Sequence, residues 1–283
     1  MIPVAFEYEV AESVEHAIEL LGRHGEDARL LAGGHSLIPL MRLRLAVPTV
    51  LIDLDRLEDL RYVRDEGDHL AIGALTRHRD LHNNEFVTEH CGIVGYTAGL
   101  LGDPSVQHRG TIGGTLAHGD PSGDMPSVVT ALEATLVVQG PDGERTIPAG
   151  EFFQDYLFTA LEPEEVVTEV RVPKLGSNTG WSYKKFARRS QDWAIVGVAA
   201  VVEKENGSIS SARIGLTSMG STPLRATSTE QALSGASAEQ VTEAANVADE
   251  GTSPATDDAA SAEFRRHLAR VWTRRAVEEA LGR

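Results

Sequence analysis

The pattern of apolar and polar positions predicts a helix near the start of the chain. Residues 13–24 place apolar side chains three or four positions apart, which is the spacing of one helical face. This face consists of Val14, Ala17, Ile18 and Leu21. Ser13 is a residue type that caps the first turn of a helix, and Gly25 is a common helix terminator. We therefore expect a helix between these two residues.

The next segments predict a β-α-β unit. Residues 28–33 form a short strand, 37–43 return to helical spacing, and 49–54 are a dense β-branched run typical of a buried strand. A loop of small residues, AGGHS at 32–36, ends the first strand. Ligands commonly bind where the strands of α/β folds end, so this loop is a candidate binding site.

The middle of the chain predicts a second set of elements. They are a strand at 69–76, helices at 77–87 and 88–101, a hairpin of 134–140 with 144–150, and a strand at 166–173. The polar stretch KLGSNTG at 174–180 is a candidate domain boundary.

The C-terminal part predicts a hairpin and a long helix. Strands are expected at 181–189 and within 195–216, with a turn around 203–207. The tail, 261–281, repeats apolar residues at helical intervals, namely Phe264, Leu268, Val271, Ala276, Val277 and Leu281. We expect this stripe to face the core of its own domain rather than a partner.

Two Gly-Gly pairs are the strongest chemical signal. One lies in AGGHS at 32–36 and the other in TIGGT at 111–115, each beside hydroxyl side chains. Glycine lets main-chain N–H groups approach an anion closely, and successive N–H groups can hold a phosphate without a cationic side chain. A single pair is usually an ordinary turn. Two pairs with neighbouring hydroxyls suit the two phosphates of a diphosphate.

Charge and cysteine content exclude several classes of protein. The 283-residue chain has 26 Lys and Arg against 42 Asp and Glu, a formal charge of −16, which argues against nucleic acid and anionic membranes as ligands. Cys91 is the only cysteine, so the chain can form no internal disulfide and no iron–sulfur cluster. We expect Cys91 to be a small core residue. The first ten residues resemble no secretory signal, and we expect a cytoplasmic protein that associates with the inner face of the membrane only through partners.

Three segments resemble a known family. They are LLAGGHSLIPLMRLRL at 30–45, LIDL at 51–54 and RGTIGGTLAHGDPSGDMP at 109–126. They look like the FAD-binding medium subunit of the molybdenum hydroxylases, the xanthine dehydrogenase family, and most resemble its aerobic carbon monoxide dehydrogenase branch. The usual dinucleotide fingerprint and the Walker-type phosphate loop are both absent.

The resemblance implies a fold and its division. We expect an α+β protein with a two-part α/β FAD-binding domain of the PCMH type, followed by a C-terminal domain of β-sheet plus helices. The implied parts are an N-terminal FAD-binding subdomain at 1–56, a second FAD-binding subdomain at 57–176 and a C-terminal flavoprotein domain at 177–283.

The resemblance also implies residues that bind FAD. In the first motif these are Ala32, Gly33, Gly34, His35, Ser36 and Leu37. In the second motif they are Thr111, Ile112, Gly113, Gly114 and Thr115. We expect the amides of both Gly-Gly pairs to donate to the diphosphate, with hydroxyl donors from Ser36, Thr111 and Thr115. For His35 we favour structural hydrogen bonding over acid–base chemistry, and His78 fits a surface or helix-end position.

Three further residues match FAD contacts of the family. Asp124 matches a carboxylate that accepts from ribose or adenine, although it also fits a turn residue. Lys185 matches a basic residue near the flavin ring, and Lys184 fits that place if the alignment shifts by one. Trp193 stands where the carbon monoxide branch has an aromatic beside the ring, although a core position suits tryptophan equally well.

The implied function is electron transfer within a larger complex. A small subunit would carry [2Fe-2S] clusters, a large subunit would carry the molybdenum cofactor, and the assembly would be a dimer of heterotrimers. This chain would pass electrons to an external acceptor, with quinone expected, and would bind no metal and no nucleic acid. Two alternatives stay open: the flavin subunit of a xanthine, aldehyde or N-heterocycle dehydrogenase, or a flavin-binding assembly module without turnover.

Overall fold

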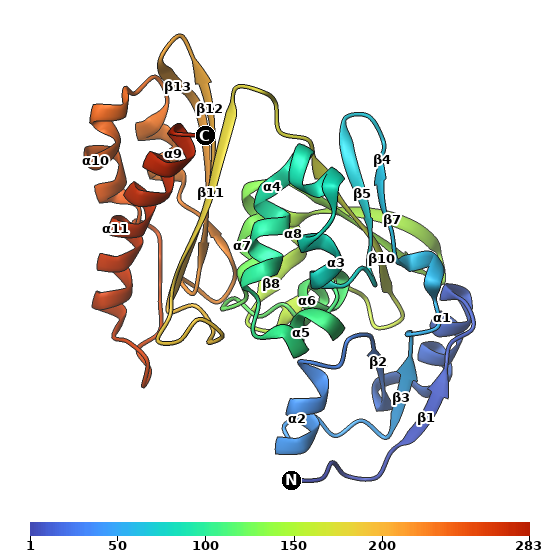
Figure 1. Ribbon diagram of the computed structural model, residues 1–283. Helices are drawn as coiled ribbons and strands as arrows, with labels where there is room; N and C mark the ends of the chain where they lie inside the picture. The colour runs from blue at the N-terminus through green and yellow to red at the C-terminus, as the bar shows by residue number, and fades with distance from the viewer.

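The computed structural model describes residues 1–283 and contains three main β-sheets, each with its own helices (Figure 1). The first sheet is parallel, in the order β1-β3-β2. Its strands are β1 (Glu7–Val10), β2 (Ala28–Leu31) and β3 (Val50–Asp53), and its helices are α1 (Val14–His24) and α2 (Leu37–Leu43). This is the predicted β-α-β unit, with β1 added at one edge.

The predicted caps bound helix α1. The Ser13 side chain accepts a hydrogen bond from the His16 amide at 3.1 Å, and Gly25 ends the helix with a φ of 55°. A left-handed residue suits glycine because it has no Cβ. Ala17, Ile18 and Leu21 are buried against the sheet, so the helical stripe read from the sequence faces the core.

The second sheet is antiparallel, in the order β4-β5-β10-β6-β7. Its strands are β4 (Val63–Asp65), β5 (His69–Gly73), β6 (Thr135–Gly140), β7 (Gly143–Pro148) and β10 (Val166–Pro173). The helices that follow β5 are α3 (His78–His82), α4 (Glu85–Leu100), α5 (Pro104–Arg109), α6 (Ile112–His118), α7 (Asp124–Ala131) and α8 (Ala149–Phe152). A small β8 (Phe153–Asp155) and β9 (Phe158–Thr159) pair beside them.

The third sheet has the order β11-β12-β13-β14. Its strands are β11 (Thr179–Phe186), β12 (Val196–Glu205), β13 (Ser208–Thr217) and β14 (Leu224–Arg225), and its helices are α9 (Thr227–Leu233), α10 (Val241–Ala244) and α11 (Ala262–Leu281). Short 3-10 turns occur at Gly25–Asp27, Glu58–Leu60, Ala238–Gln240 and Ala245–Val247. Helix α11 covers one face of this sheet, and α7 packs against the other (Figure 1).

Glycines allow the helices to approach the third sheet closely. A Cβ built on Gly215 would lie 2.1 Å from the carbonyl oxygen of Ser127 in α7. A Cβ on Gly180 would lie 1.8 Å from the carbonyl oxygen of Ala280 in α11. Either contact excludes a side chain. The sheet is therefore held between the second part of the molecule and the C-terminal helix.

The mixed helix-and-strand fold expected from the sequence is confirmed, and some local expectations are corrected. The segment 103–131, for which the sequence pattern predicts no helix, contains α5, α6 and α7. In α11, Leu268 and Val277 are buried as expected, but Phe264 is exposed. Cys91 is fully buried, at a kink in α4. No helix combines the length and apolar character needed to cross a lipid bilayer. The exact domain boundaries stay a prediction.

Candidate functional site

The two Gly-Gly motifs lie in contact, although 77 positions separate Ala32 from Arg109 along the chain. A Cβ built on Gly33 would lie 2.3 Å from the carbonyl oxygen of Arg109 and 2.8 Å from the Cα of Gly110. A Cβ on Gly114 would lie 3.5 Å from the Cβ of Ala32. The motifs therefore form one surface, and glycine is required at 33 because a side chain there would collide with backbone.

The first motif presents unused main-chain donors. The N–H groups of residues 33–37 make no hydrogen bond to another group of the protein. Gly34 has a φ of 76°, a left-handed conformation that suits glycine. The motif turns directly into α2, whose first residue is Leu37. A run of free amides at a turn of this kind is the arrangement that holds an anion.

The second motif differs from the expected open loop, because it is the start of helix α6. Thr111 caps the helix by accepting from the Gly114 amide at 3.2 Å. The Gly113 amide donates to the carbonyl of Ala74 at 2.8 Å, and the Thr115 amide donates to that of Thr111. The Gly113 and Gly114 amides thus already donate within the protein, and their contact with a diphosphate stays a prediction. The hydroxyl hydrogen of Thr111 remains available.

His78 is a buried member of this site that the sequence did not single out. Its side chain is 2 % exposed, and Nε2 lies 2.8 Å from the Thr115 hydroxyl. Burial, with a smaller contribution from nearby His35, lowers the pKa of His78 to about 4. His78 is therefore neutral at neutral pH and fixes the Thr115 side chain. Its amide also bonds to the carbonyl of Gly110, beside the contact with Gly33.

Arginines gather beside the first motif around one carboxylate. Asp55, just after β3, accepts from Arg61 at 2.6 Å, and the guanidinium groups of Arg77 and Arg109 lie 3.5 and 3.9 Å from its oxygens. Arg77 also forms an isolated bridge with Thr111. Arg61 also pairs with Glu58, so three arginines face two carboxylates and the cluster keeps one net positive charge in a strongly negative chain. An anion bound beside this cluster would therefore not depend on main-chain dipoles alone.

Asp124, at the start of α7, and Lys185, in β11, form a buried ion pair. Lys185 Nζ lies 2.7 Å from Asp124 Oδ2, and the Tyr183 hydroxyl donates to Oδ1 at 2.7 Å. Burial raises the pKa of Asp124, against the opposing effect of Lys185. Burial and the adjacent carboxylate raise the pKa of Tyr183 well above its usual range. Since both oxygens of Asp124 are engaged, its contact with ribose or adenine stays a prediction.

The alternation of β11 separates the two neighbouring lysines. Successive side chains of a strand point to opposite faces. Lys185 points toward α7, whereas Lys184 pairs with Glu279 of α11. Of the two, Lys185 therefore lies on the face that carries Asp124.

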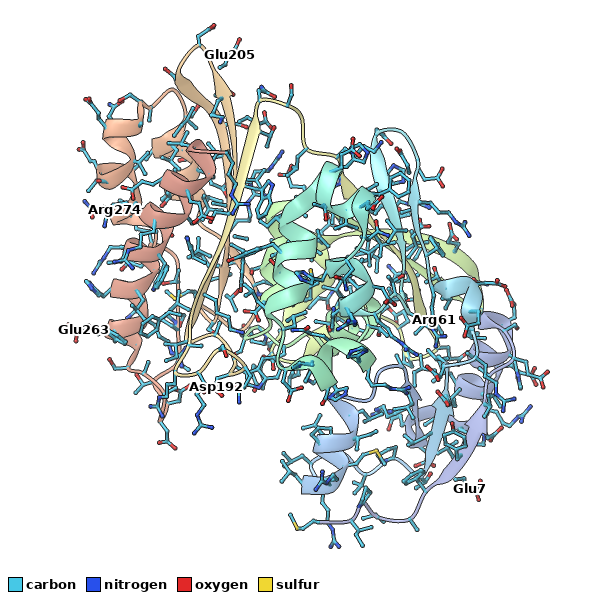
Figure 2. All side chains as sticks on the ribbon, viewed as in Figure 1. Glu7, Arg61, Asp192, Glu205, Glu263 and Arg274 are labelled. Carbon is cyan, nitrogen blue, oxygen red and sulfur yellow. The ribbon has the colours of Figure 1, made fainter.

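Trp193 is not a core residue, because 58 % of its side chain is exposed. It lies in the segment between β11 and β12, next to Asp192, which is labelled at the lower edge of the sheet in Figure 2. The following residue, Ala194, accepts from the Ser218 hydroxyl at 2.7 Å, and the Ser218 amide donates to Pro121. These bonds bring Trp193 to the same end of the molecule as the turn that begins α7.

The residues fit a dinucleotide with a diphosphate. Free amides at 33–37, hydroxyls at Ser36 and Thr111, and the nearby arginines supply donors for phosphate oxygens. The glycine contact at Gly33 keeps this surface free of a side chain. Lys185 and Trp193 lie farther along, on the C-terminal sheet and its loop.

Comparisons with known proteins agree with this fit. Residues 4–175 match the model for the FAD binding domain in molybdopterin dehydrogenase, and 181–280 match that for the CO dehydrogenase flavoprotein C-terminal domain. The chain is 42 % identical to the carbon monoxide dehydrogenase medium chain of Hydrogenophaga pseudoflava, over 100 % of this chain and 99 % of the relative. It is 38 % identical to the 6-hydroxypseudooxynicotine dehydrogenase complex subunit alpha of Paenarthrobacter nicotinovorans, over 100 % and 97 %.

A solved structure agrees equally well. The carbon monoxide dehydrogenase structure from Hydrogenophaga pseudoflava superposes with a TM-score of 0.97 and 44 % identity, over 100 % of this chain and 99 % of that one. This chain therefore belongs to the FAD-binding medium chains of the molybdopterin dehydrogenases, oxidoreductase subunits whose cofactor is FAD.

Proposed function

We propose that this chain is the electron-transfer subunit of an aerobic carbon monoxide dehydrogenase. It receives electrons from [2Fe-2S] clusters of a small subunit and passes them to an external acceptor, a quinone. A large subunit carries the molybdenum cofactor and oxidises the substrate, and the complex is a cytoplasmic dimer of heterotrimers. The observation that carries this proposal is the full-length likeness to a carbon monoxide dehydrogenase medium chain, combined with the joined glycine motifs.

In this proposal, the chain's own residues bind and orient the cofactor. The amides of 33–37 hold a phosphate, and the hydroxyls of Ser36 and Thr111 add donors. The buried His78 side chain holds the Thr115 hydroxyl in place through their hydrogen bond. Bound FAD would supply a carrier that exchanges electrons singly or in pairs. With FAD bound, Lys185, oriented by its ion pair with Asp124, would be the basic residue beside the flavin ring, and the exposed Trp193 would be the aromatic residue that covers it.

Cys91 is the single cysteine of the chain, whereas an iron–sulfur cluster takes several cysteine ligands. In this proposal, the [2Fe-2S] clusters therefore belong to another subunit.

A second candidate is the same subunit in a complex with another substrate. The chain is nearly as similar to a subunit of a 6-hydroxypseudooxynicotine dehydrogenase complex as to the carbon monoxide relative. A flavin subunit does not contact the substrate of the large subunit, so its sequence constrains that substrate weakly. An assembly module that holds FAD without turnover is the third possibility.

The test is purification of the native complex, followed by flavin assay and anaerobic absorbance spectra. Carbon monoxide should bleach the flavin bands. Bleaching by an aldehyde or an N-heterocycle, but not by carbon monoxide, would assign the second candidate. A flavin that no substrate reduces would indicate the assembly module, and a complex without flavin would contradict all three.

A further inference from the structure

The start of the chain and helix α2 lie near each other at one end of the molecule (Figure 1). Residues 1–6 and 38–47 carry exposed apolar side chains there, and we name this surface the N-terminal patch. Its apolar side chains that are at least 47 % exposed are Met1, Ile2, Val4, Leu43, Leu45 and Val47. Contiguous apolar surface of this kind is uncommon on a monomer and marks an interaction site.

The two segments of the patch lie side by side. β1 pairs in parallel with β3, with Glu7 opposite Val50, so residues 1–6 run beside residues 44–49. The Glu7 amide donates to the carbonyl of Thr49 at 2.7 Å, and Arg42 Nε donates to the carbonyl of Met1 at 3.3 Å. The exposed apolar side chains therefore belong to one surface.

The backbone of the patch is also fixed by hydrogen bonds at the end of helix α2. Helix α2 ends at Arg44, which takes a left-handed φ of 61°. The Arg44 amide donates to the carbonyl of Met41, and the Leu45 amide donates to that of Leu40. These bonds hold Leu43 and Leu45 on either side of the cap, facing solvent, whereas Met41 alone in α2 is buried.

The charge of the patch is opposite to that of the rest of the chain. The patch, residues 1–6 and 38–47, contains two arginines and no aspartate or glutamate, in a chain with a formal charge of −16. Arg42 and Arg44 are both exposed within the apolar surface. A partner that covers this surface therefore needs apolar side chains with carboxylates among them.

We propose that the N-terminal patch is the docking surface for another protein subunit of the complex, one that presents an apolar face bordered by carboxylates. The docking proposal depends on one part of the proposed function, namely that the chain works within a multisubunit complex. A second copy meeting the same patch would bring four arginines together without counter-charge. An anionic membrane would be repelled by the remaining surface.

The test uses the whole complex, made by co-expression of this chain with the large and small subunits encoded beside it. Leu43→Asp/Leu45→Asp should weaken association of this chain with the other subunits at least about tenfold, measured by native mass and titration of the purified chain. Phe86→Asp is the matched control, because Phe86 is 48 % exposed in α4, away from the patch. It should assemble like the wild type. Circular dichroism of each isolated chain checks the fold.

Hydrogen exchange gives an independent readout that needs no substitution. In the wild-type complex, amides of residues 43–47 should exchange more slowly than in the isolated chain. Unchanged exchange there, or full assembly of a folded Leu43→Asp/Leu45→Asp chain, would overturn the proposal. Flotation of the isolated chain with phosphatidylglycerol vesicles, lost in that variant while assembly persists, would also overturn it and assign the patch to a membrane.

The two proposals fail separately. Flavin content of the wild-type complex tests the cofactor role, and assembly of the variant tests the patch. A wild-type complex that assembles without flavin would reject the proposed function and leave the docking surface standing.

Discussion

Lys185 Nζ and Asp124 Oδ2 lie 2.7 Å apart, although the two residues are 61 positions apart in the sequence. Lys185 belongs to the third sheet, whereas Asp124 begins a helix of the FAD-binding part of the chain. The pair joins β11 to the start of α7, and Tyr183 extends it toward Thr217 of β13 at 3.4 Å. A buried polar network of this kind ties the C-terminal sheet to the part that carries the glycine motifs.

Lys185→Met should destabilise the chain by about 3 kcal/mol, because it leaves the Asp124 carboxylate buried without its counter-charge. Lys184→Met is the control, since Lys184 pairs with Glu279 nearer the surface and should cost less than about 1 kcal/mol. Urea unfolding of the isolated chains measures both values. Adding Asp124→Asn to Lys185→Met should restore part of the lost stability. A loss for Lys185→Met as small as that expected for Lys184→Met would show that the buried pair contributes no more than a surface pair.

Gly33→Ala should prevent FAD from being retained. The new methyl group would collide with the carbonyl oxygen of Arg109 at 2.3 Å and force the two motifs apart. Gly150→Ala is the control, because a Cβ at Gly150 meets nothing within 4 Å. The ratio of flavin to protein after gel filtration of the complex is the measurement. A Gly33→Ala complex with one flavin per chain would disprove the joined-motif site.

The free energy of unfolding should fall as the pH drops from 6.5 toward 4, in part through His78. Its folded pKa of about 4 lies below the ordinary value near 6.5, so the unfolded state binds the proton more tightly. The contribution of His78 to the free energy of unfolding is fully present above pH 6.5. Between pH 7 and pH 5 this contribution falls by about 2 kcal/mol. Denaturant unfolding at pH 7 and pH 5 measures the loss. His78→Gln should show a smaller difference between the two pH values, and an unchanged difference would contradict the burial of a neutral imidazole.

Trp193→Ala should change the flavin environment while leaving folding intact. The side chain is mostly exposed, so its removal should alter the free energy of unfolding by less than about 0.5 kcal/mol. If Trp193 covers the ring, flavin fluorescence and the visible circular dichroism of the complex should both change. Trp193→Phe should retain most of the wild-type signal, and identical spectra for Trp193→Ala and the wild type would remove this residue from the site.

Local signals in the sequence predicted much of the fold correctly. Ser13 and Gly25 bound α1, the β-branched run gave β3, and the hairpin of β6 and β7 appeared where its turn residues stand. The second glycine motif was less predictable. Glycine has a low helix propensity, so the sequence TIGGT is typical of a loop. In the structure, Thr111 caps helix α6 and the two glycines lie in its first turn.

The sequence by itself determined the helix caps, the strand alternation and the presence of two glycine pairs, because each depends on interactions within a few residues. Tertiary structure alone decided that Gly33 packs on Arg109, that Lys185 rather than Lys184 reaches Asp124, and that His78 is buried beneath Thr115. These contacts join segments from 37 to 76 positions apart. Their geometry depends on how whole sheets and helices pack, and no local pattern specifies that packing.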